Sequence, residues 1–169
     1  MEVLYKSTRG NGETVTASQA ILQGLSPDGG LYVPTMIPEL SENIRELSGL
    51  SYKEVAFIVL KKFLSDYTDD ELKGCIDSAY GKNFDNEAIA PLVKVKDAYF
   101  LELFHGPTIA FKDMALQILP HLLTTAARKN NITDDIVILT ATSGDTGKAA
   151  LAGFADVPGT KIMVFYPDG

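Results

Sequence analysis

One lysine stands where a loop of small and apolar residues passes into a predicted helix. The loop has the sequence HGPTIAFKD over residues 105–113, and the helix predicted from the apolar spacing begins at Lys112. The positive end of the helix dipole disfavours an ammonium ion there, and burial among the apolar residues 109–111 would favour the neutral amine further. A neutral amine can attack an aldehyde and later accept a proton. The spacing alone also fits a solvated surface lysine whose charge Asp113 compensates.

A second polar loop lies between a predicted strand, 136–142, and a predicted helix, 146–154. Its sequence is TSGDTG over residues 142–147, which combines two glycines that permit tight turns with the hydroxyls of Ser143 and Thr146. The start of the helix adds unpaired backbone N–H groups, so the loop could cradle a carboxylate or a phosphate. An ordinary capped turn between a strand and a helix fits the same residues equally well.

This second loop is not a nucleotide-binding P-loop. That motif needs a glycine five residues before Gly147, where this chain has Thr142. It also needs a serine or threonine that holds magnesium, at the position of Ala149. Asp145 would add a carboxylate where nucleotide phosphates need room. Lys148, in the predicted helix, could help to attract phosphate, although its position favours a solvated surface lysine.

The second half of the chain alternates strands with helices. The expected strands are 92–95, 98–104, 136–142 and 161–166, and the expected helices are 112–129, kinked at Pro120, and 146–154. The apolar run 136–142 is typical of a strand that is buried on both faces of a parallel sheet. The sequence therefore predicts an α/β fold with a doubly wound, mostly parallel sheet, in which strands 136–142 and 161–166 pair in parallel.

The first half, up to about residue 86, is expected to be mainly helical with one or two short strands. Capping boxes, in which a hydroxyl and a Glu or Gln three residues later bond to each other's backbone N–H groups, open its helices. They are Thr16–Gln19, Ser51–Glu54 and Thr68–Glu71. We therefore expect a small N-terminal domain, 1–86, followed by the first, incomplete part of a second domain, 87–169.

The composition excludes several classes of function. A net charge of −7 repels phosphate backbones, so nucleic acid is not an expected partner. The single cysteine, Cys75, has apolar neighbours at helical spacing, which predicts a buried structural thiol and not a nucleophile. No stretch has the apolar core of a signal peptide or the roughly 20 apolar residues of a membrane span. We expect a soluble, cytoplasmic protein without a membrane or metal partner.

The two loops together, in this order, resemble the threonine synthases. Residues 105–113 and 141–147 match that family's lysine and carboxylate-binding motifs, and residues 5–10 and 24–34 are similar to its N-terminal domain. The four blocks cover nearly the whole chain. The resemblance implies a pyridoxal 5'-phosphate-dependent enzyme of fold type II, with 87–169 as the beginning of its catalytic domain.

The resemblance also implies a role for each loop. Lys112 would hold the cofactor as a Schiff base and then move protons, and Phe111 would pack beside the cofactor. The substrate carboxylate would be bound by Ser143, Gly144 and Thr146. Asp145 would approach the ring oxygen of the cofactor, at a position where many fold-type-II relatives carry Asn. The implied reaction, part of threonine biosynthesis, is that of a carbon–oxygen lyase that converts O-phospho-L-homoserine and water to L-threonine and phosphate.

In this family the loop that binds the cofactor phosphate and the partner of the pyridine nitrogen come later in the chain. The remainder of the catalytic domain is therefore expected to be missing, and the 169-residue chain is expected to be an inactive N-terminal fragment. Two alternatives stay open, a non-catalytic folded fragment or interaction domain, and another fold-type-II lyase such as a dehydratase. His105 either touches cofactor or substrate or braces its loop, and Arg9 either is structural or lines the active site.

Overall fold

The computed structural model describes residues 2–10 and 12–168. Their contacts group into two compact units, and two of the three boundaries along the chain fall inside helices. Unit 1 contains residues 1–76 and 122–132, and unit 2 contains residues 77–121 and 133–169. The predicted domains, 1–86 and 87–169, are each continuous in sequence, unlike these two units. That division stays a prediction.

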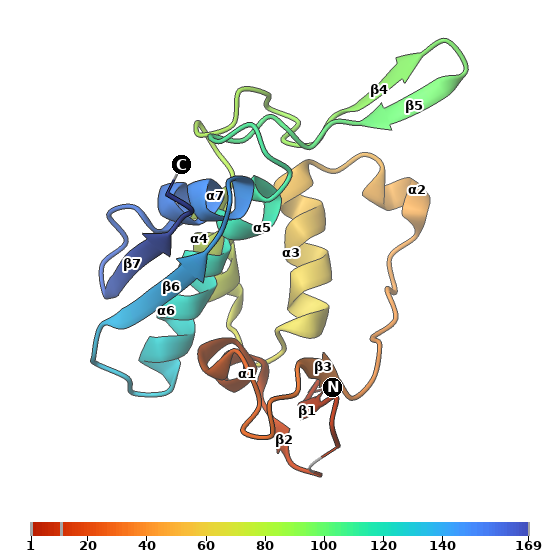
Figure 1. The fold of residues 1–169 in the computed structure, drawn as a ribbon. Coiled ribbons are helices and arrows are strands. Elements are labelled where there is room, and N and C mark those ends of the chain that lie inside the picture. The colour runs from red at the N-terminus through yellow and green to blue at the C-terminus, as the bar shows by residue number, and fades with distance from the viewer. Residues whose placement is uncertain (1, 11, 169) are drawn as a thin grey trace. The chain divides into compact units, whose positions relative to one another are not determined.

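Unit 1 combines a small antiparallel sheet with short helices (Figure 1). The sheet has the strand order β2-β1-β3, with β1 at Tyr5–Ser7, β2 at Thr14–Val15 and β3 at Tyr32–Pro34. The helices that begin in this unit are α1 (Ala17–Gln23), α2 (Ile44–Leu47), α3 (Tyr52–Phe63) and α4 (Asp69–Ala79). A further helix, α6 (Leu119–Lys129), contributes residues 122–129.

The predicted capping boxes are confirmed. Thr16 with Gln19 opens α1, Ser51 with Glu54 opens α3, and Thr68 with Glu71 opens α4. A fourth box, Asn43 with Glu46, opens α2 and was missed by the sequence reasoning, although its Asn-x-x-Glu spacing is the same. Each box satisfies backbone N–H groups that the first helical turn leaves without partners.

The core of unit 1 lies between α4 and α6. Tyr67 and Leu72 are fully buried, and the Tyr67 hydroxyl donates a hydrogen bond of 3.0 Å to the Leu122 carbonyl oxygen. Lys129 donates to Glu71 at 3.1 Å at the edge of this core. Cys75 is buried, and burial raises the pKa of its thiol, which confirms the prediction of a structural cysteine.

Unit 2 contains a hairpin and a strand–helix–strand element. The hairpin pairs β4 (Leu92–Val95) with β5 (Ala98–Leu101), and Figure 1 shows it extending away from α5 (Asp113–Leu116) and α7. β6 (Ile136–Ala141) and β7 (Thr160–Phe165) pair in parallel through the connecting helix α7 (Asp145–Phe154). The predicted parallel pairing and the α/β class are therefore confirmed.

Two predicted elements differ from the structure. The strand expected over 98–104 ends at Leu101. The helix expected over 112–129 is divided into α5 and α6, and Pro120 is the second residue of α6. Proline has no backbone N–H to donate, so a first turn, where that group would have no helical partner, accommodates it better than a helix interior.

The expectation that strand 136–142 is buried on both faces is wrong for this chain. Burial alternates along β6 and β7, because α7 covers only one face of the sheet, where Gly147 lies against Val164. The opposite face carries four apolar side chains that are 48–65% exposed, Val137, Leu139, Met163 and Phe165, with the exposed Lys161 at its edge. Within the described ranges, no helix is both long enough and apolar enough to cross a membrane.

Candidate functional site

The loop that carries the predicted lysine is built around a buried carboxylate. Asp113 is fully buried, and its two oxygens accept hydrogen bonds of 2.8 Å from the backbone N–H and the hydroxyl of Thr108. Gly106 packs directly on this side chain, since a Cβ added there would lie 2.5 Å from the Asp113 Cβ. The carboxylate thus holds the two ends of the loop together. Both of its oxygens bind Thr108, and neither forms an ion pair with Lys112, as a solvated lysine compensated by Asp113 would require.

Lys112 immediately precedes α5 and is half-buried, with its Nζ 4.3 Å from the centroid of the Phe111 ring. The expectation that its apolar neighbours bury the amine is wrong for two of the three. Ala110 is buried, but Ile109 is 73% and Phe111 60% exposed. Because Thr108, Ala110 and Asp113 take the inner positions of the turn, the residues between them face outward.

The four predicted residues of the second loop, 143–146, are all exposed at the start of α7. Gly144 is the N-cap residue, so no side chain caps the first turn of this ten-residue helix. The backbone N–H of Gly144 is bonded to the Thr142 hydroxyl at 3.3 Å. Gly147 is buried, and a Cβ there would overlap the Thr142 methyl group. The loop therefore presents an open helix start beside exposed hydroxyls, which is an arrangement that favours anions.

Two contacts join these loops within unit 2. The Lys148 ammonium donates a hydrogen bond of 3.0 Å to the Thr108 carbonyl oxygen, which lies in the lysine loop. At the other end of α7, Gly153 packs against the backbone of Leu116 in α5. Lys148 is exposed on α7, as expected of a solvated lysine, but its side chain also ties α7 to the loop that ends at Lys112. Sequence reasoning missed this tie because nothing local to Lys148 indicates its acceptor.

His105, at the start of the lysine loop, lies between two carboxylates that the sequence reasoning did not identify. Its Nδ1 is 2.5 Å from Asp85 Oδ1, and its Nε2 is 2.9 Å from Glu102 Oε2. Both ring nitrogens are thus engaged within the protein, which agrees with the bracing role among the two that were expected.

Arg9 lies in unit 1, in a network that joins the blocks 5–10 and 24–34. Its Nη1 donates to the Asp28 carbonyl oxygen at 2.9 Å, and the Asp28 side chain accepts bonds of 2.7 Å from Ser7 and 2.9 Å from the Gly30 N–H. These bonds, the Ser7 hydroxyl foremost, lower the pKa of the Asp28 carboxyl. The contacts support the structural interpretation of Arg9.

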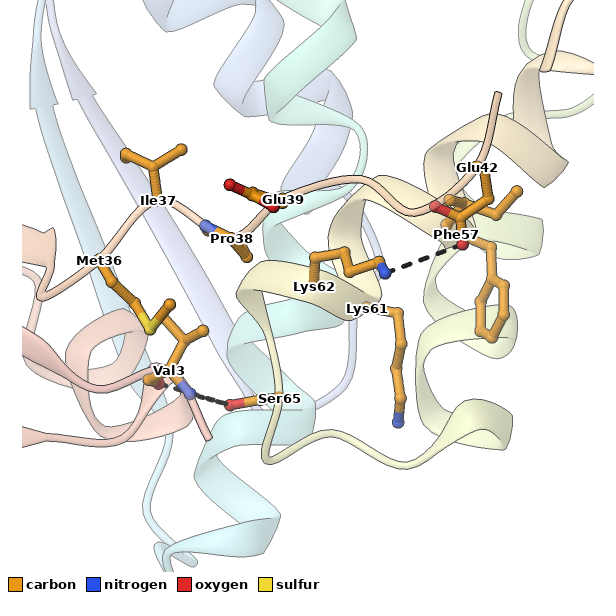
Figure 2. A pocket seen from close by; sticks show the side chains of 11 residues that line it. Val3, Met36, Ile37, Pro38, Glu39, Glu42, Phe57, Lys61, Lys62 and Ser65 are labelled. Carbon is orange, nitrogen blue, oxygen red and sulfur yellow. Dashed lines mark hydrogen bonds and ion pairs between the residues drawn. The ribbon is translucent and has the colours of Figure 1, made fainter. Parts of the chain in front are cut away.

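Unit 1 also contains a pocket of about 750 Å³, whose lining residues all belong to this unit (Figure 2). Apolar residues such as Met36 and Phe57 form much of its wall, and charged side chains lie at its edge. Among the latter, Lys62 is 3.8 Å from Glu42 and donates to Ser41 at 3.0 Å. No group of three or more potential metal ligands occurs among residues 2–10 and 12–168.

Comparison with known proteins shows that the chain is similar to threonine synthases. Residues 4–80 match the family model described as threonine synthase N terminus. The chain is 41% identical to the threonine synthase of Pseudomonas aeruginosa and 38% identical to that of Schizosaccharomyces pombe, over 96% and 99% of its own length. It covers 35% and 34% of those two proteins, so it spans about a third of the length of these relatives.

The solved structures agree with this result. The pyridoxal-phosphate-bound threonine synthase from Brucella melitensis matches 99% of this chain and 36% of its own, with a TM-score of 0.91 and 40% identity. The yeast enzyme matches 98% of this chain with a TM-score of 0.89 and 34% identity. In sequence and in fold, the chain therefore matches the N-terminal portion of the threonine synthases.

Proposed function

We propose that this chain is the part of a threonine synthase that provides Lys112 as the attachment point for pyridoxal 5'-phosphate. The observation that carries the proposal is the joined pair of loops, in which Lys148 bonds the start of α7 to the loop that ends at Lys112. The Lys112 amine and the uncapped N-terminus of α7 therefore both belong to unit 2. The reaction would convert O-phospho-L-homoserine and water to L-threonine and phosphate, and a cytoplasmic location stays a prediction.

The residues present fit the aldehyde end of this cofactor. The Lys112 amine is only half-buried, so an aldehyde can reach it, and Asp113 fixes the backbone on which it stands. Beside it the exposed Phe111 ring offers a flat apolar surface to the pyridine ring. The relative from Brucella melitensis binds this cofactor at 40% identity to the present chain.

The protein's own groups would divide the work between the two loops. Lys112 would accept and return protons at the substrate carbons, since one amine held over the substrate can serve several transfers. Ser143, Gly144 and Thr146 would bind the substrate carboxylate with hydroxyls and backbone N–H groups at the uncapped start of α7. The cofactor, when bound, would act as the electron sink that stabilises negative charge on those carbons.

Asp145 requires a separate role, because its carboxylate lies in the first turn of α7. The helix dipole favours a negative charge at this place, but a substrate carboxylate bound nearby would be repelled. We propose that Asp145 accepts a hydrogen bond from a protonated group of the cofactor and so directs its charge away from the substrate.

The rest of the catalytic domain would come from residues beyond this segment, because the relatives are about three times as long. The exposed apolar face of β6 and β7 is the surface of unit 2 that such residues would cover. The exposure of residues 143–146 and Phe111 favours, for the 169-residue chain alone, the alternative of a folded but non-catalytic fragment.

The attachment point can be tested on the product of the full open reading frame that encodes this chain. Borohydride reduction in the presence of the cofactor, followed by peptide mapping, should give one pyridoxyl group, on Lys112. Lys148 is the internal comparison, since its ammonium is already bonded to Thr108. Recovery of the label on Lys148 would contradict the assignment. Conversion of serine or threonine to a 2-oxo acid and ammonia, with no threonine formed from O-phosphohomoserine, would instead favour a dehydratase.

A second expected result concerns the 169-residue chain by itself. It should bind no stoichiometric cofactor and release no phosphate from O-phosphohomoserine, because a lone amine attaches an aldehyde weakly and catalysis depends on groups held in fixed geometry. Visible spectra recorded during titration with pyridoxal phosphate, together with a phosphate assay, measure both. A tight one-to-one complex with turnover would show that the chain is active on its own.

A further inference from the structure

His105 is held by carboxylates from both ends of the β4–β5 hairpin. Asp85 precedes β4 and contacts Nδ1 at 2.5 Å, while Glu102 follows β5 and contacts Nε2 at 2.9 Å. The imidazole is 12% exposed, and its face stacks on the Phe104 ring at a centroid distance of 4.7 Å. The charged groups that face this ring are therefore Asp85 and Glu102.

Only one protonation state of His105 satisfies both contacts. An ionised carboxylate accepts hydrogen bonds but donates none, and a neutral imidazole carries a single N–H. Both contacts are hydrogen bonds only when the ring is the doubly protonated imidazolium. The bonds to Glu102 and then Asp85 accordingly raise the pKa of His105 above its ordinary value.

Backbone hydrogen bonds follow the same path as the side chains. The Asp85 N–H donates to the His105 carbonyl oxygen at 3.0 Å, and the Glu102 N–H donates to the Pro91 carbonyl oxygen at 3.0 Å. Segments 85–91 and 102–105 are thereby joined at both ends. The imidazolium adds side-chain hydrogen bonds between the same two segments, through Asp85 and Glu102.

The joint leads directly into the lysine loop. Gly106, the next residue, packs on the side chain of Asp113, which binds Thr108 and is the first residue of α5. We propose that His105 is a positioning residue: clamped between Asp85 and Glu102, its imidazolium fixes where the lysine loop begins. The inference rests on the proposed role of Lys112, and it concerns how that lysine is held and not the reaction itself.

The sign of the pH dependence follows from the raised pKa. The contribution of the clamp to stability is complete below the pKa of an unfolded histidine, about 6.5. It is lost as the pH rises through the higher pKa of the folded state, because loss of the proton breaks one of the two bonds. A rise in pH through that pKa should therefore loosen the start of the lysine loop.

The test is an NMR titration of the cofactor-free 169-residue chain labelled with ¹⁵N-histidine and on its backbone amides. The chain has two histidines, and burial lowers the pKa of the other, His121, so it serves as the control. The His105 ring should titrate above the ordinary value of about 6.5, with both nitrogens protonated below its midpoint. The Thr108 amide should shift with the same midpoint.

Asp85→Asn removes one carboxylate while preserving the shape of its side chain. The midpoints of the His105 ring and of the Thr108 amide should then fall together, and that of His121 should stay in place. A His105 midpoint at or below about 6.5, or a Thr108 amide that does not follow the titration of His105, would overturn the proposal. Since no cofactor is present, this result is independent of where borohydride fixes the cofactor in the full-length product.

Discussion

Replacing Gly153 by alanine is expected to destabilise the chain by about 2 kcal/mol, although Gly153 lies inside a helix where alanine is the better helix former. The added Cβ would overlap the Leu116 carbonyl oxygen and lie 3.0 Å from its carbonyl carbon. These are backbone atoms and cannot rotate away, so α7 and α5 must separate. Overpacking of this kind costs about 3 kcal/mol, and the gain in helix propensity offsets about 1 kcal/mol of it.

Gly74 is the matched control, because it also lies inside a helix, α4, but is exposed with open space around it. Gly74→Ala should stabilise the chain by about 1 kcal/mol, chiefly because alanine loses less backbone entropy on folding. Urea unfolding followed by circular dichroism measures both variants. Shifts of the same sign in the two proteins would mean that helix propensity, and not the contact between α7 and α5, decides the effect at Gly153.

Individual elements of the fold were predictable where local signals are strong. The capping boxes rest on two residues three positions apart, and the parallel pairing of β6 and β7 follows from two apolar runs linked by one helix. The division between α5 and α6 was harder to predict, because Pro120 indicates only that a regular helix is interrupted near it. Whether the chain kinks or begins a new helix depends on packing that is not local.

The contacts that build the site could not be predicted, because they join residues that are distant in the sequence. Asp85 precedes His105 by 20 residues, and Lys148 follows Thr108 by 40. A sequence motif indicates the reactive group, but it does not show which distant residues position that group. The predictions of burial were wrong for a related reason, since the burial of a side chain depends on what covers it. An apolar run such as 136–141 has the same sequence whether one face of the strand is covered or both.

The roles of Lys112 and its neighbour Asp113 are expected to separate when each is replaced. In the full-length product, Lys112→Ala should lower turnover at least ~10³-fold, because proton transfer by a positioned base alone contributes about 10² to 10⁴ and covalent attachment is lost as well. The stability of the 169-residue chain should change by less than about 0.5 kcal/mol, since Lys112 is half-buried and its amine contacts the exposed Phe111 ring. Urea unfolding and a phosphate-release assay measure the two effects.

Asp113→Ala should show the opposite signature in the unfolding experiment. It would leave the N–H and hydroxyl of the buried Thr108 without their acceptors, at about 1 to 3 kcal/mol for each group, so the loop should open and the chain lose about 3 kcal/mol. Turnover of the full-length Asp113→Ala product should fall as well, because the amine is no longer held in place.

An added primary amine distinguishes the two losses. It should partly restore turnover in Lys112→Ala, where a base is missing from an intact loop, and should not do so in Asp113→Ala, where the loop itself has opened. If Lys112→Ala retained more than about a tenth of the turnover, Lys112 would not be the acid–base residue of the reaction. If it destabilised the chain as much as Asp113→Ala, Lys112 would belong to the scaffold of the loop and not to its chemistry.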